Sequence, residues 1–195
     1  MDQDCRKEFL MRLLPRLRFV DLEACDGGKD AWPIEIGIAA FRGYRDLETT
    51  SWSSRIRPDP SWPEDRWSTY AERVHCISRP ELDGAPTARD VSIRVRELLG
   101  IQGLVLVSDS PGNDQPWLDR LMDLSGGPLE NRISSVPGAL GSLIPQGGTK
   151  LLREALRSLE PPTHRAAEDA SRLARGLLCA FVAPEPEQEP AGPHP

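Results

Sequence analysis

Residues 19–24, with the sequence FVDLEA, are the part of the chain on which the interpretation most depends. An apolar run at residues 17–20 leads into this stretch and predicts a β-strand. Asp21 and Glu23 are two residues apart, and residues with that spacing on a strand point to the same face of a sheet. Because unpaired buried carboxylates are costly, two carboxylates that face one site at the end of a strand need cations.

The spacing of these two acids is not specific by itself. A second Asp-x-Glu occurs at Asp46 and Glu48, in a polar stretch where we expect solvated side chains. Asp21 and Glu23 could likewise be surface acids. Their place at the end of an apolar run favours a functional site, and the interpretation then depends on acids found later in the chain.

Asp114 is the first of these later acids. It lies in VLVSDSPGNDQPWL, where an apolar run predicts a strand, SPGN a turn and PWL the start of a helix. Ser110 or Asn113 could cap that helix. An acid near a helix start can simply interact favourably with the helix dipole, so a structural role for Asp114 is open beside a role in the site.

His164 and Asp169 lie in HRAAEDA near the end of the chain. Five residues of an α-helix turn through roughly 500°, which leaves two such side chains on different sides of a helix. They would share a site more easily if His164 preceded the helix and Asp169 lay in its first turn. Pro161 and Pro162 support a helix that starts after them.

The whole chain predicts both β-strands and α-helices. We expect strands at residues 17–20, 34–41, 49–58, 104–108 and 132–136, with the first three forming a meander. We expect helices at residues 69–74, 87–100, 116–127, 149–160 and after His164, the last with Ala170, Leu173, Leu177 and Phe181 on its inner face. This order predicts a mixed α/β layer fold.

The composition of the chain limits the kinds of protein that it can be. With 195 residues and 38% apolar content, residues 1–183 suit one globular domain, whereas the Pro/Glu-rich residues 184–195 are too polar to fold. The longest apolar runs are too short for a membrane span, and the four scattered cysteines favour the cytoplasm over a disulfide framework or a zinc site. The net charge of −6 argues against holding long nucleic acid by bulk electrostatics, but an enzyme could still grip a few terminal nucleotides.

The acids and the histidine together predict a metal site. Carboxylate oxygens without cysteine or clustered histidine indicate Mg²⁺ or Mn²⁺ rather than zinc. Two such ions can activate a water molecule and stabilise the leaving oxygen in phosphodiester cleavage. A nearby histidine can take the proton from that water at neutral pH.

With these motifs in this order, the sequence resembles the DEDDh family of 3′–5′ exonucleases, which includes proofreading subunits, ribonuclease T and oligoribonuclease. FVDLEA with PIEIGIAAF resembles the first motif, VSDSPGNDQPWL the second and HRAAEDA the third, while VHCISRPEL resembles the H-G-I segment between the first two. The likeness covers about residues 15–182.

The resemblance implies a ribonuclease H-like three-layer fold with a central five-stranded mixed sheet flanked by helices. It implies release of 5′-mononucleotides from single-stranded 3′ ends, with His164 as general base. It implies two Mg²⁺ or Mn²⁺ ions on Asp21, Glu23, Asp114 and Asp169. We further expect substrate contacts from Leu22, Ala24, His75 and Trp117, although core packing is the other role open to Trp117.

The sequence departs from the family pattern around the catalytic positions. Ala24 stands where the family often has Thr, and Cys76 stands where it usually has Gly. Asp109 begins a segment that replaces the family's H-N-A-x-F-D, and its carboxylate could join the metal shell or cap the turn. All five catalytic positions are kept, so these changes affect the recognition of the terminal nucleotide.

Four points stay open at this stage. The chain could be a non-catalytic module that binds nucleic-acid 3′ ends or a protein, or it could be an endonuclease or phosphodiesterase that acts on a small signalling nucleotide with the same metal chemistry. RNA and DNA are not distinguished, because that choice depends on contacts to the 2′-hydroxyl. A homodimer is also open, since the basic N-terminal segment could serve an interface or a phosphate path (Arg6, Lys7, Arg12, Arg16 and Arg18).

Overall fold

A computed structural model describes residues 3–43, 48–144 and 146–181. Its centre is a five-stranded sheet in the order β3-β2-β1-β4-β5. The strands are β1 (Leu17–Ala24), β2 (Pro33–Phe41), β3 (Thr49–Arg55), β4 (Val105–Ser108) and β5 (Ile133–Ser135). The proposed tail at residues 184–195 and the acid Asp46 lie outside the described residues.

The sheet is mixed, as the sequence predicts. β1, β2 and β3 form an antiparallel meander, whereas β1 pairs with β4, and β4 with β5, in parallel. The pairing of β1 with β4 covers Leu17 to Phe19 alone, although β1 itself continues to Ala24. The carboxyl-terminal half of β1 therefore extends beyond the end of β4, and the edge of β1 that pairs with β4 is left for other groups there.

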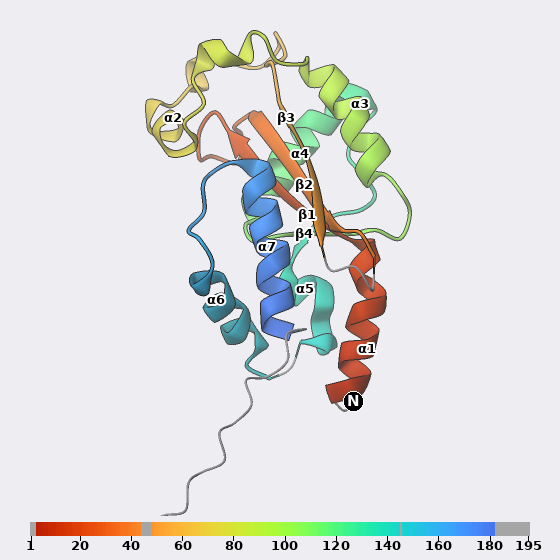
Figure 1. Cartoon of the computed structure of the whole chain (residues 1–195). Helices are drawn as coiled ribbons and strands as arrows, with labels where there is room; N and C mark the ends of the chain where they lie inside the picture. The colour runs from red at the N-terminus through yellow and green to blue at the C-terminus, as the bar shows by residue number, and fades with distance from the viewer. Residues whose placement is uncertain (1–2, 44–47, 145, 182–195) are drawn as a thin grey trace, which may run out of the picture.

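Helices cover both faces of the sheet (Figure 1). They are α1 (Gln3–Leu13), α2 (Thr69–His75), α3 (Ala88–Leu99), α4 (Pro111–Met122), α5 (Val136–Leu140), α6 (Gly148–Ser158) and α7 (Ala166–Phe181). Short 3₁₀ turns are η1 (Leu14–Arg16), η2 (Glu64–Arg66), η3 (Arg79–Leu82), η4 (Asp123–Ser125) and η5 (Gly141–Leu143). No helix in the described part of the chain has the length and apolar character that a membrane span requires.

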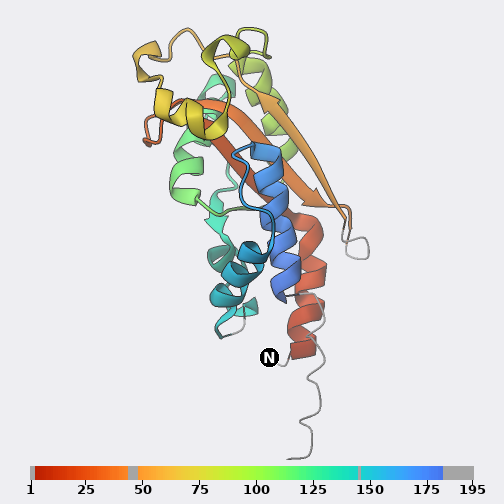
Figure 2. The ribbon, with the colours of Figure 1, turned by 60° about the vertical axis from the view of Figure 1, so that its left-hand side comes forward.

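Three helices differ from the sequence-based expectation. The helix α5 was not predicted, and its first residue, Val136, was expected in the strand at residues 132–136. The helix α1 was not predicted, and it extends away from the sheet at the end where β1 begins (Figure 2). The helix α4 begins at Pro111 rather than Pro116, because proline suits the first helical position, where its missing N–H has no intrahelical partner. Pro116 is then accommodated inside α4, and Ser110 occupies the N-cap position without a side-chain hydrogen bond.

The alternation of side chains along β1 divides the interior into two cores. Val20, Leu22 and Ala24 pack in a core that includes α3 and α4. Phe19 belongs to the other core, which includes the predicted inner-face residues Ala170, Leu173 and Leu177 of α7, with Phe181 partly buried against it. Because side chains alternate along a strand, Asp21 and Glu23 share the face of Phe19 and α7.

Gly37 explains how closely α7 approaches the sheet. A Cβ atom on Gly37 of β2 would lie 2.1 Å from the carbonyl carbon of Ala166, the first residue of α7. No side chain fits there, so the start of α7 rests directly on the backbone of β2. Since Gly37 pairs with Asp21 of β1, this contact places the start of α7 beside the acidic end of β1.

We predict that Gly37→Ala displaces α7 and destabilises the protein, because backbone atoms cannot move aside as a flexible side chain would. Overpacking of this kind costs about 1–3 kcal/mol, which urea unfolding would measure. Gly84→Ala is the matched control, because a Cβ atom added at Gly84 would meet nothing within 4 Å. Equal stability of the two variants would contradict the close contact between α7 and β2.

Candidate active site

The acids Asp21 and Glu23 lie at the carboxyl-terminal half of β1, beyond its pairing with β4. Both are partly buried, and in the antiparallel register Asp21 lies opposite Gly37 and Glu23 opposite Glu35. The absence of a side chain at Gly37 leaves this face of the sheet to the start of α7. Because Asp21 and Glu23 are two residues apart on β1, both carboxylates lie under the first turn of that helix.

Asp114 joins the site from the first turn of α4 and is 1% exposed. Its Oδ1 accepts a hydrogen bond from the backbone N–H of Leu22 (3.2 Å), and its Oδ2 accepts one from the hydroxyl of Ser108. The Ser108 hydroxyl in turn accepts from the N–H of Ser110 (2.8 Å). These bonds use the edge of β1 that β4 leaves open and fix Asp114 beside Asp21.

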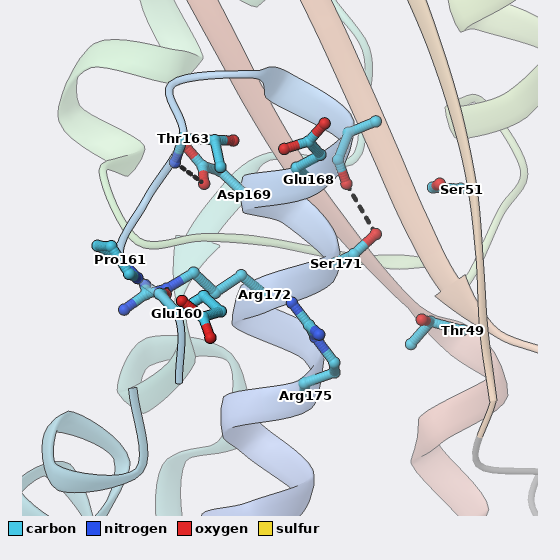
Figure 3. A pocket seen from close by; sticks show the side chains of 11 residues that line it. Thr49, Ser51, Glu160, Pro161, Thr163, Glu168, Asp169, Ser171, Arg172 and Arg175 are labelled. Carbon is cyan, nitrogen blue, oxygen red and sulfur yellow. Dashed lines mark hydrogen bonds between the residues drawn. The ribbon is translucent and has the colours of Figure 1, made fainter. Parts of the chain in front are cut away.

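His164 and Asp169 arrive from the opposite side, on the segment that leads into α7. His164 precedes the helix with a positive φ of 54°, and Asp169 lies in its first turn, as predicted. The Asp169 carboxylate accepts from the backbone N–H groups of Thr163 (3.0 Å) and His164 (2.9 Å). Figure 3 shows the first of these bonds, which closes the turn over the helix start.

The structure brings these side chains into two adjoining groups. Asp21, Asp109 and Asp114 form one, and in each group the potential ligand atoms lie within 4.8 Å of one another. Glu23, His164 and Asp169 form the other. All five residues predicted from the sequence are thus present, and Asp109, for which two roles were open, lies with the metal-ligating candidates.

Burial and mutual repulsion raise the pKa values of the acids strongly. Burial, followed by repulsion from Asp169, raises the pKa of Glu23 to about 8. Burial raises the pKa of Asp114 to about 7, and it raises that of Asp21 well above its usual range, with Asp114 as the next cause. Asp109 lies at the surface, but partial desolvation and repulsion from Asp169 also raise its pKa.

These shifts show that the acids are poorly compensated by the protein alone. Among the described residues, Oδ2 of Asp21 is buried without a hydrogen-bond partner, and it belongs to the residue at the centre of the acids. Carboxylate oxygens are the ligands that Mg²⁺ and Mn²⁺ prefer, and two groups of ligands suit two ions. The donor set and the orphaned oxygen therefore fit divalent cations.

The four expected substrate-binding residues are all buried. Leu22 and Ala24 point into the core on the opposite face of β1. Trp117 is 8% exposed and its indole N–H donates to the Gly28 carbonyl (2.8 Å), which corresponds to the packing role. Contact with substrate through these side chains would require rearrangement.

His75 is also buried, yet it differs from the other three. Its Nδ1 accepts from the N–H of Ile77 (3.1 Å), while Nε2 has no hydrogen-bond partner among the described residues. Burial lowers the pKa of this imidazole, which favours its neutral form. Substrate contact by His75 therefore stays a prediction.

A cavity of about 440 Å³ opens beside Asp169 (Figure 3). Thr49 and Ser51 of the edge strand β3 form one wall, and the polar side of α7 forms another. Arg172 in this wall donates to the carbonyls of Glu160 (2.6 Å) and Leu156 (2.5 Å), which holds the end of α6 against α7. The cavity adjoins the site through Asp169.

Sequence reasoning missed the pair of Glu35 and Arg165. Glu35 lies on β2 with a side chain 4% exposed, and its carboxylate is bonded by the Arg165 guanidinium at 2.6 and 3.1 Å. A signal for it was present in the sequence, since Glu35 is the charged residue in the otherwise apolar PIEIGIAAF. Such a residue on a buried strand needs a partner.

Comparison with solved structures relates the fold of this chain to the folds of known exonucleases. The nuclease domain of 3′hExo, described as a DEDDh family member and bound to rAMP, matches with a TM-score of 0.60 and 18% identity over 87% of this chain and 96% of that chain. Exonuclease X in complex with 5′ overhanging duplex DNA matches with a TM-score of 0.55 and 21% identity, over 84% of this chain and 90% of that chain.

The fold is ribonuclease H-like. Exonuclease I of E. coli, in complex with a dA16 oligonucleotide, matches with a TM-score of 0.62 and 10% identity over 85% of this chain. The chain spans only about 41% of that protein's length. The match confirms the fold that the resemblance implied, a five-stranded mixed sheet with flanking helices.

Sequence comparison alone finds neither a matching protein-family profile nor a matching curated protein. The likeness to the exonuclease domains is therefore one of three-dimensional structure at low identity.

We predict that Asp21→Asn stabilises the protein when divalent ions are removed. Burial and nearby acids raise the folded-state pKa of Asp21 well above its usual value, so this group lowers the stability of the fold at pH values above its unfolded-state pKa, and an amide, which does not titrate, removes this effect. The melting temperature in EDTA should rise by about 2–4 °C per kcal/mol relieved. The control is Glu97→Gln, which removes an exposed ion pair with Arg94 on α3 and should change the melting temperature little. A melting temperature at or below that of the wild type would count against this origin of the shift.

We also predict that Mn²⁺ affinity rises between about pH 6 and about pH 8, because the ions must displace protons from Asp114 and Glu23. Glu23 and Asp114 hold protons below pKa values of about 8 and about 7, so the affinity should level off above about pH 8. Titration calorimetry at several pH values would measure this dependence. Constant affinity over the range would contradict the assignment of these acids as ligands.

Proposed function

We propose that the chain is a metal-dependent 3′–5′ exonuclease that releases 5′-mononucleotides from single-stranded nucleic-acid ends. One observation carries the proposal: side chains from β1, the β4–α4 connection and the start of α7 converge in two adjoining groups of potential metal ligands. The ribonuclease H-like fold on which they converge is the one found in structures of 3′-exonucleases.

The carboxylates would hold two Mg²⁺ or Mn²⁺ ions. Asp21, Asp114 and Asp109 would supply one group of ligands, and Glu23 with Asp169 the other. When bound, the ions would supply activation of a water molecule and stabilisation of charge on the leaving oxygen. The backbone bonds to Asp114 and Asp169 orient both acids before any ion binds.

His164 would accept the proton of the attacking water. It is exposed, and a ring nitrogen lies within 4.8 Å of carboxylate oxygens of Glu23 and Asp169. The left-handed backbone at His164 and the bond from its N–H to Asp169 hold the residue at the mouth of the site. An imidazole in this place can take a proton at neutral pH.

The nucleotides and oligonucleotides bound in the similar structures support nucleic acid as the class of substrate. Exonuclease I was solved with the single-stranded oligonucleotides dT13 and dA16, and 3′hExo with rAMP. A further match describes the recognition of a histone mRNA stem-loop by a 3′-exonuclease, so both RNA and DNA occur with proteins of this fold, and the choice between them is part of the test. With a net charge of −6, the chain suits a grip on a few terminal nucleotides rather than a long bound strand.

Two further proposals concern the setting of the enzyme. The scattered cysteines support a cytoplasmic location. The position of α1 at the opposite end of β1 from the acids argues against a phosphate path along the basic N-terminal segment, and a homodimer interface is the role that we propose for it (Figure 1). Arg12 and Arg18 are engaged locally, with Glu8 and with the carbonyls of Pro15 and Leu17.

The test uses 5′-labelled single-stranded RNA and DNA of equal sequence, incubated with the protein and Mn²⁺. We predict a ladder that shortens from the 3′ end, is abolished by EDTA, and is slowed about 10²–10⁴-fold in His164→Ala, the usual contribution of a general base. Glu97→Gln, which removes an exposed carboxylate far from the site in sequence, should retain full activity.

Each alternative has its own outcome in this experiment. Oligonucleotides left intact in every reaction would refute the exonuclease, and retention on an oligonucleotide column in EDTA would then indicate a non-catalytic 3′-end-binding module. Hydrolysis of small signalling nucleotides with intact oligonucleotides would indicate a phosphodiesterase.

A further inference from the structure

Glu35 is a buried carboxylate that the proposed chemistry does not use. It lies on β2 directly opposite Glu23 of β1, so the two side chains share the face of the sheet on which α7 packs. Its carboxylate accepts three hydrogen bonds, two from Arg165 (2.6 and 3.1 Å) and one from the backbone N–H of Ala166 (3.0 Å). These three bonds to the Glu35 carboxylate thus come from the first residue of α7 and the residue before it.

The partners of Glu35 lie next to the proposed general base. Arg165 follows His164 directly, and Ala166 is the first residue of α7. Asp169 closes the same turn from the other side through the N–H groups of Thr163 and His164. The backbone that carries His164 is therefore held between two carboxylates, one from the sheet and one from the helix.

Gly37 supports this arrangement independently. It lies two residues from Glu35 on the same strand, and the backbone of Ala166 and Ala167 occupies the space of its missing side chain. Gly37 sets how near the start of α7 comes to β2, but a contact of this kind does not fix rotation or sliding of the helix. The two parallel hydrogen bonds from Arg165 to Glu35 restrict that rotation and sliding.

The charges of the pair also bear on the metal ligands. Glu35 repels and Arg165 attracts the charge on Glu23, so the two effects oppose each other at that carboxylate. Loss of the Glu35 charge alone would leave a guanidinium beside Glu23, and loss of Arg165 alone would leave an extra buried carboxylate there. The two losses have opposite electrostatic effects on a cation held by Glu23.

We propose that Glu35 and Arg165 form a positioning pair that fixes His164 and Asp169 over Glu23 and keeps this part of the metal site electrically balanced. The proposal rests on the proposed exonuclease function. The pair does not contact the reacting atoms. It acts through the backbone of residues 164–169, whose displacement by about 1 Å would lower the rate roughly 10²-fold.

The test compares Glu35→Gln, Arg165→Gln, the double variant and Arg165→Lys in the full chain. Both single neutral variants should lower kcat for an oligonucleotide by about 10–100-fold with little change in KM, measured below the melting temperature. The double variant should lose less than the product of the two single effects, since the residues act as a pair. Arg165→Lys, which keeps the charge but not the two-pronged geometry, should fall between Arg165→Gln and the wild type.

Mn²⁺ binding, followed by electron paramagnetic resonance, is the second readout. Glu35→Gln should weaken Mn²⁺ binding about threefold or more, whereas Arg165→Gln should not weaken it, and the double variant should resemble the wild type. A pair that only stabilised the fold would lower the melting temperature of both variants without this opposite effect on the ion.

Arg132→Gln is the matched control, because Arg132 makes a two-pronged bond of the same kind with Asp119 (2.7 and 2.8 Å) on α4, outside the acidic groups. It should leave kcat and Mn²⁺ affinity unchanged. Wild-type kcat and Mn²⁺ affinity in Glu35→Gln would overturn the proposal. If the wild type cleaves no oligonucleotide, the proposed function fails, and the Mn²⁺ titration still decides the pair, since equal affinities in all variants would overturn it.

Discussion

The constraint on which the rest of the structure depends is the repulsion among carboxylates gathered at one end of β1. Asp21, Glu23 and Asp114 are largely removed from water, and each holds its proton far more tightly than a free side chain. A fold tolerates such a cluster only where the surrounding structure is strong enough to hold it. Here that strength comes from the two apolar cores on either side of the sheet, which β1 itself separates.

The donors that hold Asp114 and Asp169 are backbone N–H groups and the Ser108 hydroxyl, which are uncharged. Asp114 is bonded to the N–H of Leu22, and Asp169 to those of Thr163 and His164. Amide donors orient a carboxylate without neutralising it, so the negative charge stays available to divalent ions. In the same region Arg165 is bonded to Glu35 and not to a member of the two groups of potential ligands.

Much of this arrangement could be predicted because it depends on local patterns. The apolar run before Asp21 and the prolines before His164 place each residue at the end of an element, and the structure confirms the strand, the meander and the helix start. Local patterns do not predict that the second half of β1, the end of β4 and the start of α7 lie together. That expectation came from the resemblance to a family, and the solved structures confirm the expected fold.

The parts that could not be predicted depend on contacts between distant residues. Nothing near Glu35 in the sequence indicates that a guanidinium 130 residues later will bind it. Core packing of Trp117 was one of the two roles open from the sequence, but its hydrogen bond to the Gly28 carbonyl could not be predicted, because the acceptor lies on a distant loop. Likewise, the sequence around Asp109 suits a turn as well as a metal site. The end of β4 beside the open half of β1 places Asp109 near Asp21 and Asp114, and its role as a metal ligand stays a prediction.

Asp169 shows how the ligand set and the base are mechanically linked. Its two oxygens accept the N–H groups of the turn that carries His164, and the same oxygens are candidates for an ion shared with Glu23. A carboxylate oxygen has more than one acceptor position, so it can keep an amide donor while it binds a cation. Asp169 would thus connect a bound ion to the turn that carries the imidazole. The start of α7, on which Asp169 lies, is held against the sheet through the contacts of Ala166 with Glu35 and Gly37.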